Sequence, residues 1–161
     1  MGAENIKLVA VSEADKLILA NLFQLYRYDS SEFNEDDIDA FGKFAISSHF
    51  DLYWTEAERY PFFIELGTQL VGFVLAREFA PENYSVAEFF VMRKYRRAGT
   101  GKRAAFLLFD KFPAEWHVAQ EESNLAAQAF WKAVVAEYTK GNYEEGFSRS
   151  QPKGPKLIFH T

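Results

Sequence analysis

Basic side chains and two glycines gather between positions 94 and 103, in a spacing that can bind a phosphate. The basic residues are Lys94, Arg96, Arg97, Lys102 and Arg103, and the glycines are Gly99 and Gly101. An apolar strand is predicted before them at 86–92, and a helix after them at 102–111. A helix N-terminus carries unpaired N–H groups and partial positive charge, and glycine lets an anion approach the backbone closely. We therefore expect a phosphate-bearing cofactor at this strand–turn–helix unit.

Two common phosphate-binding motifs fit this turn poorly. A Walker loop requires G-x-x-x-x-G-K-[ST]. Here Arg96 occupies the place of the first glycine and another arginine follows Lys102, so this motif is excluded. The dinucleotide pattern G-x-G-x-x-G/A is matched by Gly99, Gly101 and Ala104. A dinucleotide fold, however, needs several more strand–helix units, and the chain after Gly101 is too short for them and ends in a predicted hairpin.

The composition limits the class of protein. With 161 residues, of which 48% are hydrophobic and 17% aromatic, the chain can form one well-packed domain over 1–161. Its net charge of −5 argues against a nucleic-acid partner, because nucleic-acid-binding proteins are usually basic. No apolar run approaches the ~20 residues that span a bilayer, so no membrane partner is expected.

The absence of cysteine excludes disulfides, cysteine-ligated zinc and a thiol nucleophile. The N-terminal segment, residues 1–7, lacks an apolar signal, and together these features favour a cytoplasmic protein. His49, His117 and His160 are too widely separated for metal-ligand spacing, so no metal site is predicted.

Hydrophobic periodicity predicts a mixed fold, α/β of the α+β kind. Strands are expected at 6–11, 62–66, 70–77, 86–92, 116–120, 143–149 and 156–160, and helices at 12–26, 34–45, 102–111 and 124–138. The strand at 70–77 is apolar on both faces and should be central in the sheet. A polar break at 28–37 separates the first two helices, and Asn34 can cap the second, which would place Ile38 and Phe41 on one face. We expect a central twisted sheet of about six to seven strands flanked by about four helices.

The segment R-R-A-G-T-G, residues 96–101, resembles the acetyl-CoA pyrophosphate loop of the GNAT superfamily of N-acetyltransferases. It follows an apolar strand and opens a helix, as in that family. Asn124, Ala127 and Phe130 resemble the second family signature, on the helix that follows. The resemblance covers roughly residues 60–140, and the predicted order of elements is similar to the GNAT fold. It implies a single GNAT-like domain that uses acetyl-CoA as co-substrate.

The resemblance also implies which residues contact acetyl-CoA. Backbone groups of Phe90, Val91 and Met92 would contact the pantetheine arm and the acyl carbonyl. The pyrophosphate would be held by backbone N–H groups of the loop, which comprises Arg97, Ala98, Gly99, Thr100, Gly101 and Lys102. Arg96 would add positive charge, and Asn124 would hydrogen-bond the pantetheine arm.

Acetyl transfer to an amine requires a neutral amine, a stabilised oxyanion and a proton for the leaving thiolate. Without cysteine, no thioester can form on the enzyme, so direct attack in a ternary complex is expected, and the resemblance implies the same mechanism. Glu88 is the candidate base, because many family members carry an acid on this strand. The general acid is unknown: the family's tyrosine is replaced by Trp131, whose indole is not a proton donor for this step.

The acceptor is expected to be a small-molecule or peptide amine, bound between the first two helices and the closing hairpin. The mouth of this binding site would be acidic and aromatic through Tyr26, Tyr28, Asp29 and Glu32, which suits a cationic acceptor. The alternative function is a non-catalytic acyl-CoA-binding sensor or interaction module, which Trp131 favours. The sequence does not identify the acceptor, and a homodimer is left open.

Overall fold

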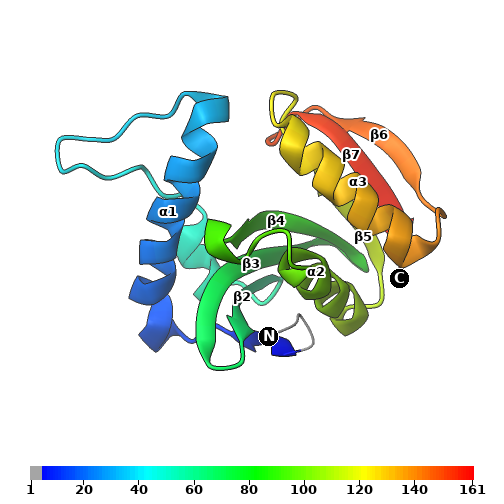
Figure 1. Cartoon of the computed structure of the whole chain (residues 1–161), viewed down its shortest axis with the longest axis horizontal. Coiled ribbons are helices and arrows are strands. Elements are labelled where there is room, and N and C mark those ends of the chain that lie inside the picture. The colour runs from blue at the N-terminus through cyan, green and yellow to red at the C-terminus, as the bar shows by residue number, and fades with distance from the viewer. Residues whose placement is uncertain (1–4) are drawn as a thin grey trace.

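Seven strands pair into one mixed sheet in the computed structural model, which describes residues 5–161 (Figure 1). The strands are β1 (Ile6–Ala10), β2 (Arg59–Leu66), β3 (Gln69–Ala80), β4 (Asn83–Val91), β5 (Glu115–Ala119), β6 (Glu144–Ser148) and β7 (Gly154–His160). Their order in the sheet is β1-β2-β3-β4-β5-β7-β6. The predicted mixed fold is therefore confirmed, and β3 is enclosed by β2 and β4.

Three α-helices are present in residues 5–161, and not the four that the sequence predicts: α1 (Lys16–Asn34), α2 (Thr100–Lys111) and α3 (Leu125–Thr139). The helix expected at 34–45 is absent, and α1 continues through the expected polar break. Ser30 and Ser31 allow this because their hydroxyls donate to carbonyls within the helix, at 3.2 and 2.6 Å. Glu35 ends α1 in the left-handed conformation at φ 61°. No helix in residues 5–161 is both long and apolar enough to cross a membrane.

The segment between α1 and β2 extends away from the sheet and lacks a core of its own. Phe41, which the helical prediction would have buried, is 87% exposed. Asp39 shapes the turn instead, since its Oδ1 accepts from the backbone N–H groups of Phe41 and Lys43. A short 3-10 helix, Phe50–Trp54, then returns the chain to the sheet, where Phe50 is buried.

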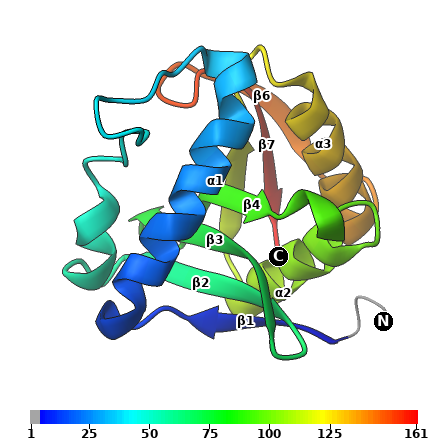
Figure 2. The same ribbon diagram turned by 60° about the vertical axis from the view of Figure 1, so that its left-hand side comes forward.

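The helices cover opposite faces of the sheet. Figure 2 shows α1 crossing β2, β3 and β4 on one face, where Phe23 stacks on Phe73 at 4.8 Å between ring centroids. On the other face, Phe109 of α2 and Trp131 of α3 pack with the fully buried Trp116 of β5. Because side chains alternate along a strand, neighbouring positions of β2 and β3 supply both cores.

The sheet opens between β4 and β5, which are parallel. They pair only over residues 83–85 of β4 and 115–117 of β5, although β4 continues to Val91. In Figure 1, β1 to β4 form the lower left part of the molecule, and β5 to β7 the upper right. The backbone of residues 88–91 therefore has a β3 partner on one side and no β5 partner on the other.

A bulge in β4 accompanies this opening. Leu75 of β3 pairs with Glu88, but the next residue, Ala76, pairs with Val86. Ala87 is therefore an extra residue in β4, and it reverses the facing of the positions that follow it. Val86 belongs to the core beneath α2 and α3, whereas Glu88 lies beside α1.

Candidate active site

The Glu88 carboxylate and the Tyr26 hydroxyl meet between β4 and α1. Tyr26 packs edge-on against Phe73 and Phe90, with ring centroids 5.6 and 6.0 Å apart, which holds its ring on the sheet. Its hydroxyl donates a hydrogen bond to Oε2 of Glu88. A carboxylate that can exchange protons is thus positioned at the edge of an aromatic core, on β4, the strand that diverges from β5.

Burial raises the pKa of Glu88 above its ordinary value of 4.5. The hydrogen bond from Tyr26 and the positive charge of Arg27 oppose that rise in pKa, and the negative charge of Glu121 adds to it. Burial and the Glu88 charge hold the pKa of Tyr26 well above 10. Tyr26 therefore remains a hydrogen-bond donor at neutral pH, and the raised pKa of Glu88 makes it a better proton acceptor than an ordinary carboxylate.

The predicted phosphate loop forms an N-terminal turn with free backbone donors. Arg97 and Gly99 have left-handed φ values of 62° and 82°, and α2 begins at Thr100. The first hydrogen bond of the helix is from Arg103 N to Gly99 O, at 2.9 Å. In the described part of the chain, no backbone acceptor is found for the N–H groups of residues 97–102. The loop thus fits an anion such as a pyrophosphate.

Packing is tight at one glycine of this turn. A Cβ on Gly101 would lie 3.0 Å from Cζ of Phe130, on the α3 helix. The start of α2 is therefore held close to α3, and a larger residue fits only if the Phe130 ring shifts. Lys102 strengthens the same contact through an ion pair with Glu137, at 3.1 Å.

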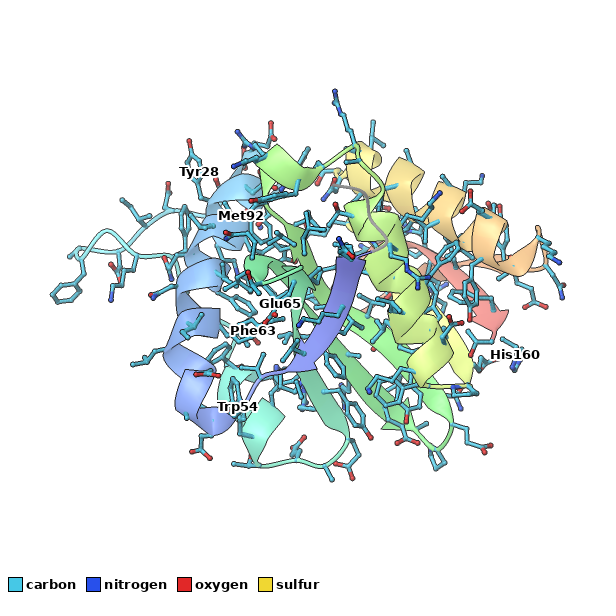
Figure 3. All side chains as sticks on the ribbon, turned by 60° about the horizontal axis from the view of Figure 1, so that its bottom comes forward. Tyr28, Trp54, Phe63, Glu65, Met92 and His160 are labelled. Atoms are coloured by element: carbon cyan, nitrogen blue, oxygen red, sulfur yellow. The ribbon has the colours of Figure 1, made fainter. Side chains whose placement is uncertain are left out.

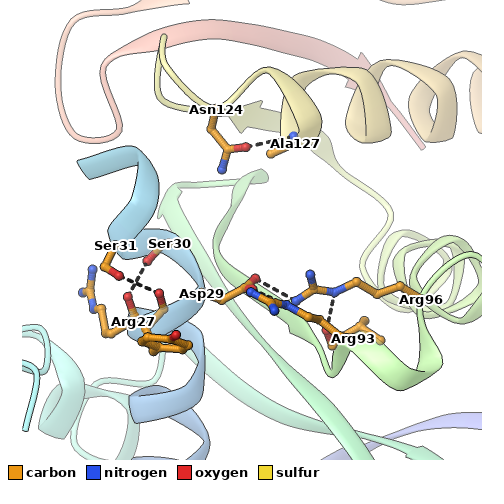
Figure 4. Close-up of polar contacts among 10 residues, drawn as sticks. Arg27, Asp29, Ser30, Ser31, Arg93, Arg96, Asn124 and Ala127 are labelled. Carbon is orange, nitrogen blue, oxygen red and sulfur yellow. Dashed lines mark hydrogen bonds and ion pairs between the residues drawn. The ribbon is translucent and has the colours of Figure 1, made fainter. Parts of the chain in front are cut away.

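Arg96 is engaged with the protein and does not extend freely from the loop (Figure 4). Its Nε donates to the carbonyl of Val91 at 2.7 Å, and its Nη2 pairs with Asp29 at 2.7 Å. Arg93 pairs with the other oxygen of Asp29 at 3.0 Å. Asp29, expected in the acceptor mouth, thus connects α1 to the cofactor loop, and two arginines balance its charge.

Two polar side chains border the opening between β4 and β5. Asn124 caps α3, since its Oδ1 accepts from Ala127 N at 3.0 Å, and Figure 4 places it across from Asp29 and Arg96. Gln120 follows β5, is 7% exposed, and its Nε2 has no hydrogen-bond partner among residues 5–161. Such a donor fits a ligand carbonyl. Sequence reasoning missed Gln120, although it continues the inward positions of Trp116 and Val118.

A surface cavity of about 550 Å³ lies between the end of α1, the β5–α3 loop and the β6–β7 loop. Its lining residues are Arg27, Asn34, Asp36, Glu121, Glu122, Ser123, Gln151 and Lys153. Two of them, Arg27 and Glu121, carry charges that act on the pKa of Glu88, and Arg27 is the residue next to Tyr26, which donates to that carboxylate. Ser123 joins two of its walls, because its Oγ donates to Phe33 O at 3.2 Å.

The residues predicted for the acceptor mouth have separate locations. Tyr26 contacts Glu88, and Asp29 pairs with arginines. Tyr28 is 66% exposed, and its ring lies 6.5 Å from that of Phe44. Glu32 is exposed on α1. None of these four lines the cavity, whose acidic residues come from the loops. Sequence reasoning missed Arg27, Glu121 and Lys153, because no local pattern brings these three segments together.

Trp131 is a core residue. It is 5% exposed, and its ring lies edge-on to Phe89 at 4.9 Å. Tyr138, further along α3, donates to Asp110 at 2.6 Å. Tyr84 stacks on Phe112 at 5.0 Å, in a separate aromatic group. These contacts give none of the three side chains the position of a proton donor beside Glu88.

A smaller cavity of about 170 Å³ lies at the β5–β7 end, lined by Glu115, Tyr143 and His160 among others. Figure 3 places His160 on the opposite side of the molecule from Tyr28 and Met92. Its lining comes from β5–β7 and not from α1, so the larger cavity, which Arg27 of α1 lines, is the candidate acceptor site. Within residues 5–161, no group of His, Asp and Glu side chains is arranged to hold a metal ion.

Solved acetyltransferase structures have the same fold as this chain. An acetyltransferase from Thermus thermophilus is 16% identical, with 100% of both chains covered and a TM-score of 0.75. The aminoglycoside acetyltransferase AAC(6′)-Ib, in complex with coenzyme A and kanamycin, is 13% identical over 96% of this chain and 94% of that chain, with a TM-score of 0.67. A spermidine N-acetyltransferase chimera of SpeG from Vibrio cholerae and hSSAT is 11% identical over 96% and 93%, with a TM-score of 0.60.

A comparison with curated protein sequences found no match. The model of the acetyltransferase (GNAT) family matches residues 22–134, which is more than half of the chain. This match includes Tyr26, Glu88, the loop at 96–101 and Asn124. The chain therefore belongs to the acetyltransferase (GNAT) family, which is the family that the loop at 96–101 resembles.

Proposed function

We propose that the protein is an acetyl-CoA-dependent N-acetyltransferase that transfers the acetyl group directly to a bound amine. The observation that carries this proposal is the position of Glu88. It has a raised pKa, a hydrogen bond from Tyr26 of α1, and a place on the part of β4 that has no β5 partner. A base at this point separates a cofactor side from an acceptor side.

The cofactor side has the donors that acetyl-CoA needs. Backbone N–H groups of residues 97–102 would hold the pyrophosphate, and residues 90–92, which have no β5 partner, would lie along the pantetheine arm. Asn124 and Gln120 would donate to amide or acyl carbonyls of that arm through their side-chain NH₂ groups. When bound, acetyl-CoA supplies an activated acetyl thioester. Arg96 acts indirectly, by fixing the Val91 carbonyl and the loop.

On the acceptor side, Glu88 would remove a proton from the ammonium group, directly or through one water. The neutral amine then attacks the acetyl carbonyl, an N–C bond forms, the nitrogen gives up a second proton to solvent, and the C–S bond to coenzyme A breaks. Tyr26 orients the Glu88 carboxylate by its hydrogen bond. Solvent can protonate the leaving thiolate, since Trp131 is buried in the core and the Tyr138 hydroxyl is bonded to Asp110.

A non-catalytic acyl-CoA-binding module is the second candidate, because Trp131 is buried at the position of the family's tyrosine. Both candidates require acetyl-CoA binding. At a ligand concentration of 100 times Kd, binding stabilises a protein by about 2.7 kcal/mol, or roughly 5–10 °C in a domain of this size. No thermal shift with acetyl-CoA would contradict both candidates.

Thiol release in the presence of an amine panel separates them. We expect turnover with at least one amine, a loss of turnover in Glu88→Gln, and an unchanged acetyl-CoA shift in that variant. Glu65→Gln is the matched control, because Glu65 is also a partly buried strand carboxylate but lies on β2 and pairs with Lys7. Full turnover in Glu88→Gln would refute the assignment of the base.

A further inference from the structure

Arg27 is a charged side chain whose role neither the fold nor the proposed chemistry explains. It is partly buried on α1, and its Nε is buried without a hydrogen-bond partner among residues 5–161. The guanidinium lies over the rings of Phe23 and Tyr26, 6.0 and 5.8 Å from their centroids. Buried polar atoms are rarely left unpaired, because desolvation without a hydrogen bond is costly. A bound ligand is one way to pair it.

Arg27 also lines the larger cavity, and its guanidinium lies over the ring of Tyr26, whose hydroxyl donates to Glu88. Its charge acts on the Glu88 carboxyl and on Tyr26, which is the adjacent residue of α1. Elsewhere in the cavity lining, Asp36, Glu121 and Glu122 supply negative charge and Lys153 a second positive charge. The cavity therefore contains both signs, with a cation next to the base.

This arrangement suits a zwitterion better than a polycation. Glu88 and Glu121 favour an ammonium group, whereas a second ammonium beside Arg27 would be repelled. A guanidinium is flat, always charged, and matches the two oxygens of a carboxylate. Because Tyr26 and Arg27 are neighbours and Tyr26 holds Glu88, the amine and the carboxylate would belong to one small ligand.

We propose that the acceptor is an amine that also bears a carboxylate, of the amino-acid class, and that Arg27 binds that carboxylate and determines specificity. This inference rests on the proposed function, since it assigns the acceptor of the same site. Arg27 contacts the substrate away from the reacting nitrogen. Its loss should therefore reduce acceptor affinity much more than acetyl-CoA binding.

The test compares amines with and without the carboxylate: L-lysine with cadaverine, L-ornithine with putrescine, L-tyrosine with tyramine, and L-leucine with isoamylamine. Binding to the protein saturated with coenzyme A is measured by calorimetry, so turnover is not required. We expect at least one amino acid to bind ten-fold or more tightly than its decarboxylated partner, as one charge-assisted pair allows. Arg27→Gln should abolish that preference, Arg27→Lys should retain part of it, and the exposed Arg77→Gln should retain it fully.

Equal binding of both members of every pair would overturn the inference, and so would no binding of either. A preference that persists in a folded Arg27→Gln variant would overturn it as well. Circular dichroism and the acetyl-CoA thermal shift establish that the variant is folded.

The failure of this inference can be distinguished from the failure of the proposed function. If decarboxylated amines are acetylated as well as the matching amino acids, the protein is an acetyltransferase but Arg27 does not determine its specificity. If acetyl-CoA neither binds nor reacts, the enzyme assignment falls, and calorimetry on the free protein still tests Arg27.

Discussion

Removal of the Tyr26 hydroxyl should move the acidic limb of the pH profile of kcat/KM to higher pH. In the folded protein, the hydrogen bond from Tyr26 stabilises the charged form of Glu88 and so lowers its pKa. Tyr26→Phe keeps the ring that packs on Phe73 and Phe90, but loses this donor. The pKa of Glu88, already raised by burial, should therefore rise further.

The size of the shift follows from the strength of the bond. A hydrogen bond to a charged group contributes about 1.5–3 kcal/mol, and one pKa unit corresponds to about 1.36 kcal/mol. The limb should therefore move up by roughly 1–2 pH units. Because kcat/KM reports ionisations of the free enzyme and free substrate, the limb that belongs to the acceptor amine should remain in place. Below the wild-type limb, the variant should be slower by roughly 10–100-fold, and well above it the two rates should converge.

The assay is thiol release at subsaturating acceptor between about pH 5 and pH 10, chosen to cover both limbs. Tyr53→Phe is the control, because Tyr53 is a buried tyrosine of the same core that makes no hydrogen bond to Glu88 and has its own pKa raised to about 12. Its neutral hydroxyl can be removed without moving the limb. An unshifted limb in Tyr26→Phe would refute the reasoning, and an acidic limb that survives Glu88→Gln would assign the base to another residue.

Three further variants test the fold and the cofactor loop. Glu88→Gln should raise the melting temperature of the protein more at pH 8 than at pH 4. The folded pKa of Glu88 is raised, so its contribution to stability is full while it is protonated and is lost as pH rises through that pKa. An equal change in melting temperature at both pH values would contradict this. Gly72→Ala should lower the free energy of unfolding by about 2–4 kcal/mol in urea titrations, because its Cβ would overlap the Phe90 carbonyl oxygen. Gly146→Ala is the control: the nearest atom to its Cβ lies at 3.4 Å, so the free energy of unfolding should change by less than about 0.5 kcal/mol. Gly101→Asp should abolish the thermal shift with acetyl-CoA, since it brings a negative charge to the loop and a Cβ 3.0 Å from Phe130, and an unchanged shift would exclude this loop as the pyrophosphate site.

Local patterns were sufficient for the glycine turn at 97–101 and the helix after it. Two glycines after an apolar strand predict a turn and a helix start wherever the rest of the chain lies, because backbone conformation and helix capping depend on near neighbours. The structure confirms the turn, with Gly99 in the left-handed conformation and α2 starting at Thr100. The apolar character of 70–77 likewise located the strand β3 in the interior of the sheet.

The same local reasoning failed at residues 34–45. Asn34 and the spacing of Ile38 and Phe41 satisfy a helical pattern, but a short helix needs a face to bury. The chain turns away from the sheet after Glu35, and Ile38 and Phe41 are 56% and 87% exposed. Whether an amphipathic segment meets a core depends on where the preceding helix ends, and α1 runs further than its polar sequence indicates.

At Glu88, local residue patterns explain the position in the chain, and long-range contacts explain the surroundings of the side chain. The residue types and spacing placed Glu88 as a carboxylate on the strand before the loop, and the resemblance to the GNAT family made it the candidate base. Simple alternation from Val86 would have turned it toward α2 and α3. The extra residue Ala87 turns it toward α1 instead, where Tyr26, 62 positions earlier in the chain, donates to it and Arg27 lies nearby. A bulge depends on pairing with a neighbouring strand, and a hydrogen bond across 62 residues depends on the whole fold, so neither is encoded in any local pattern.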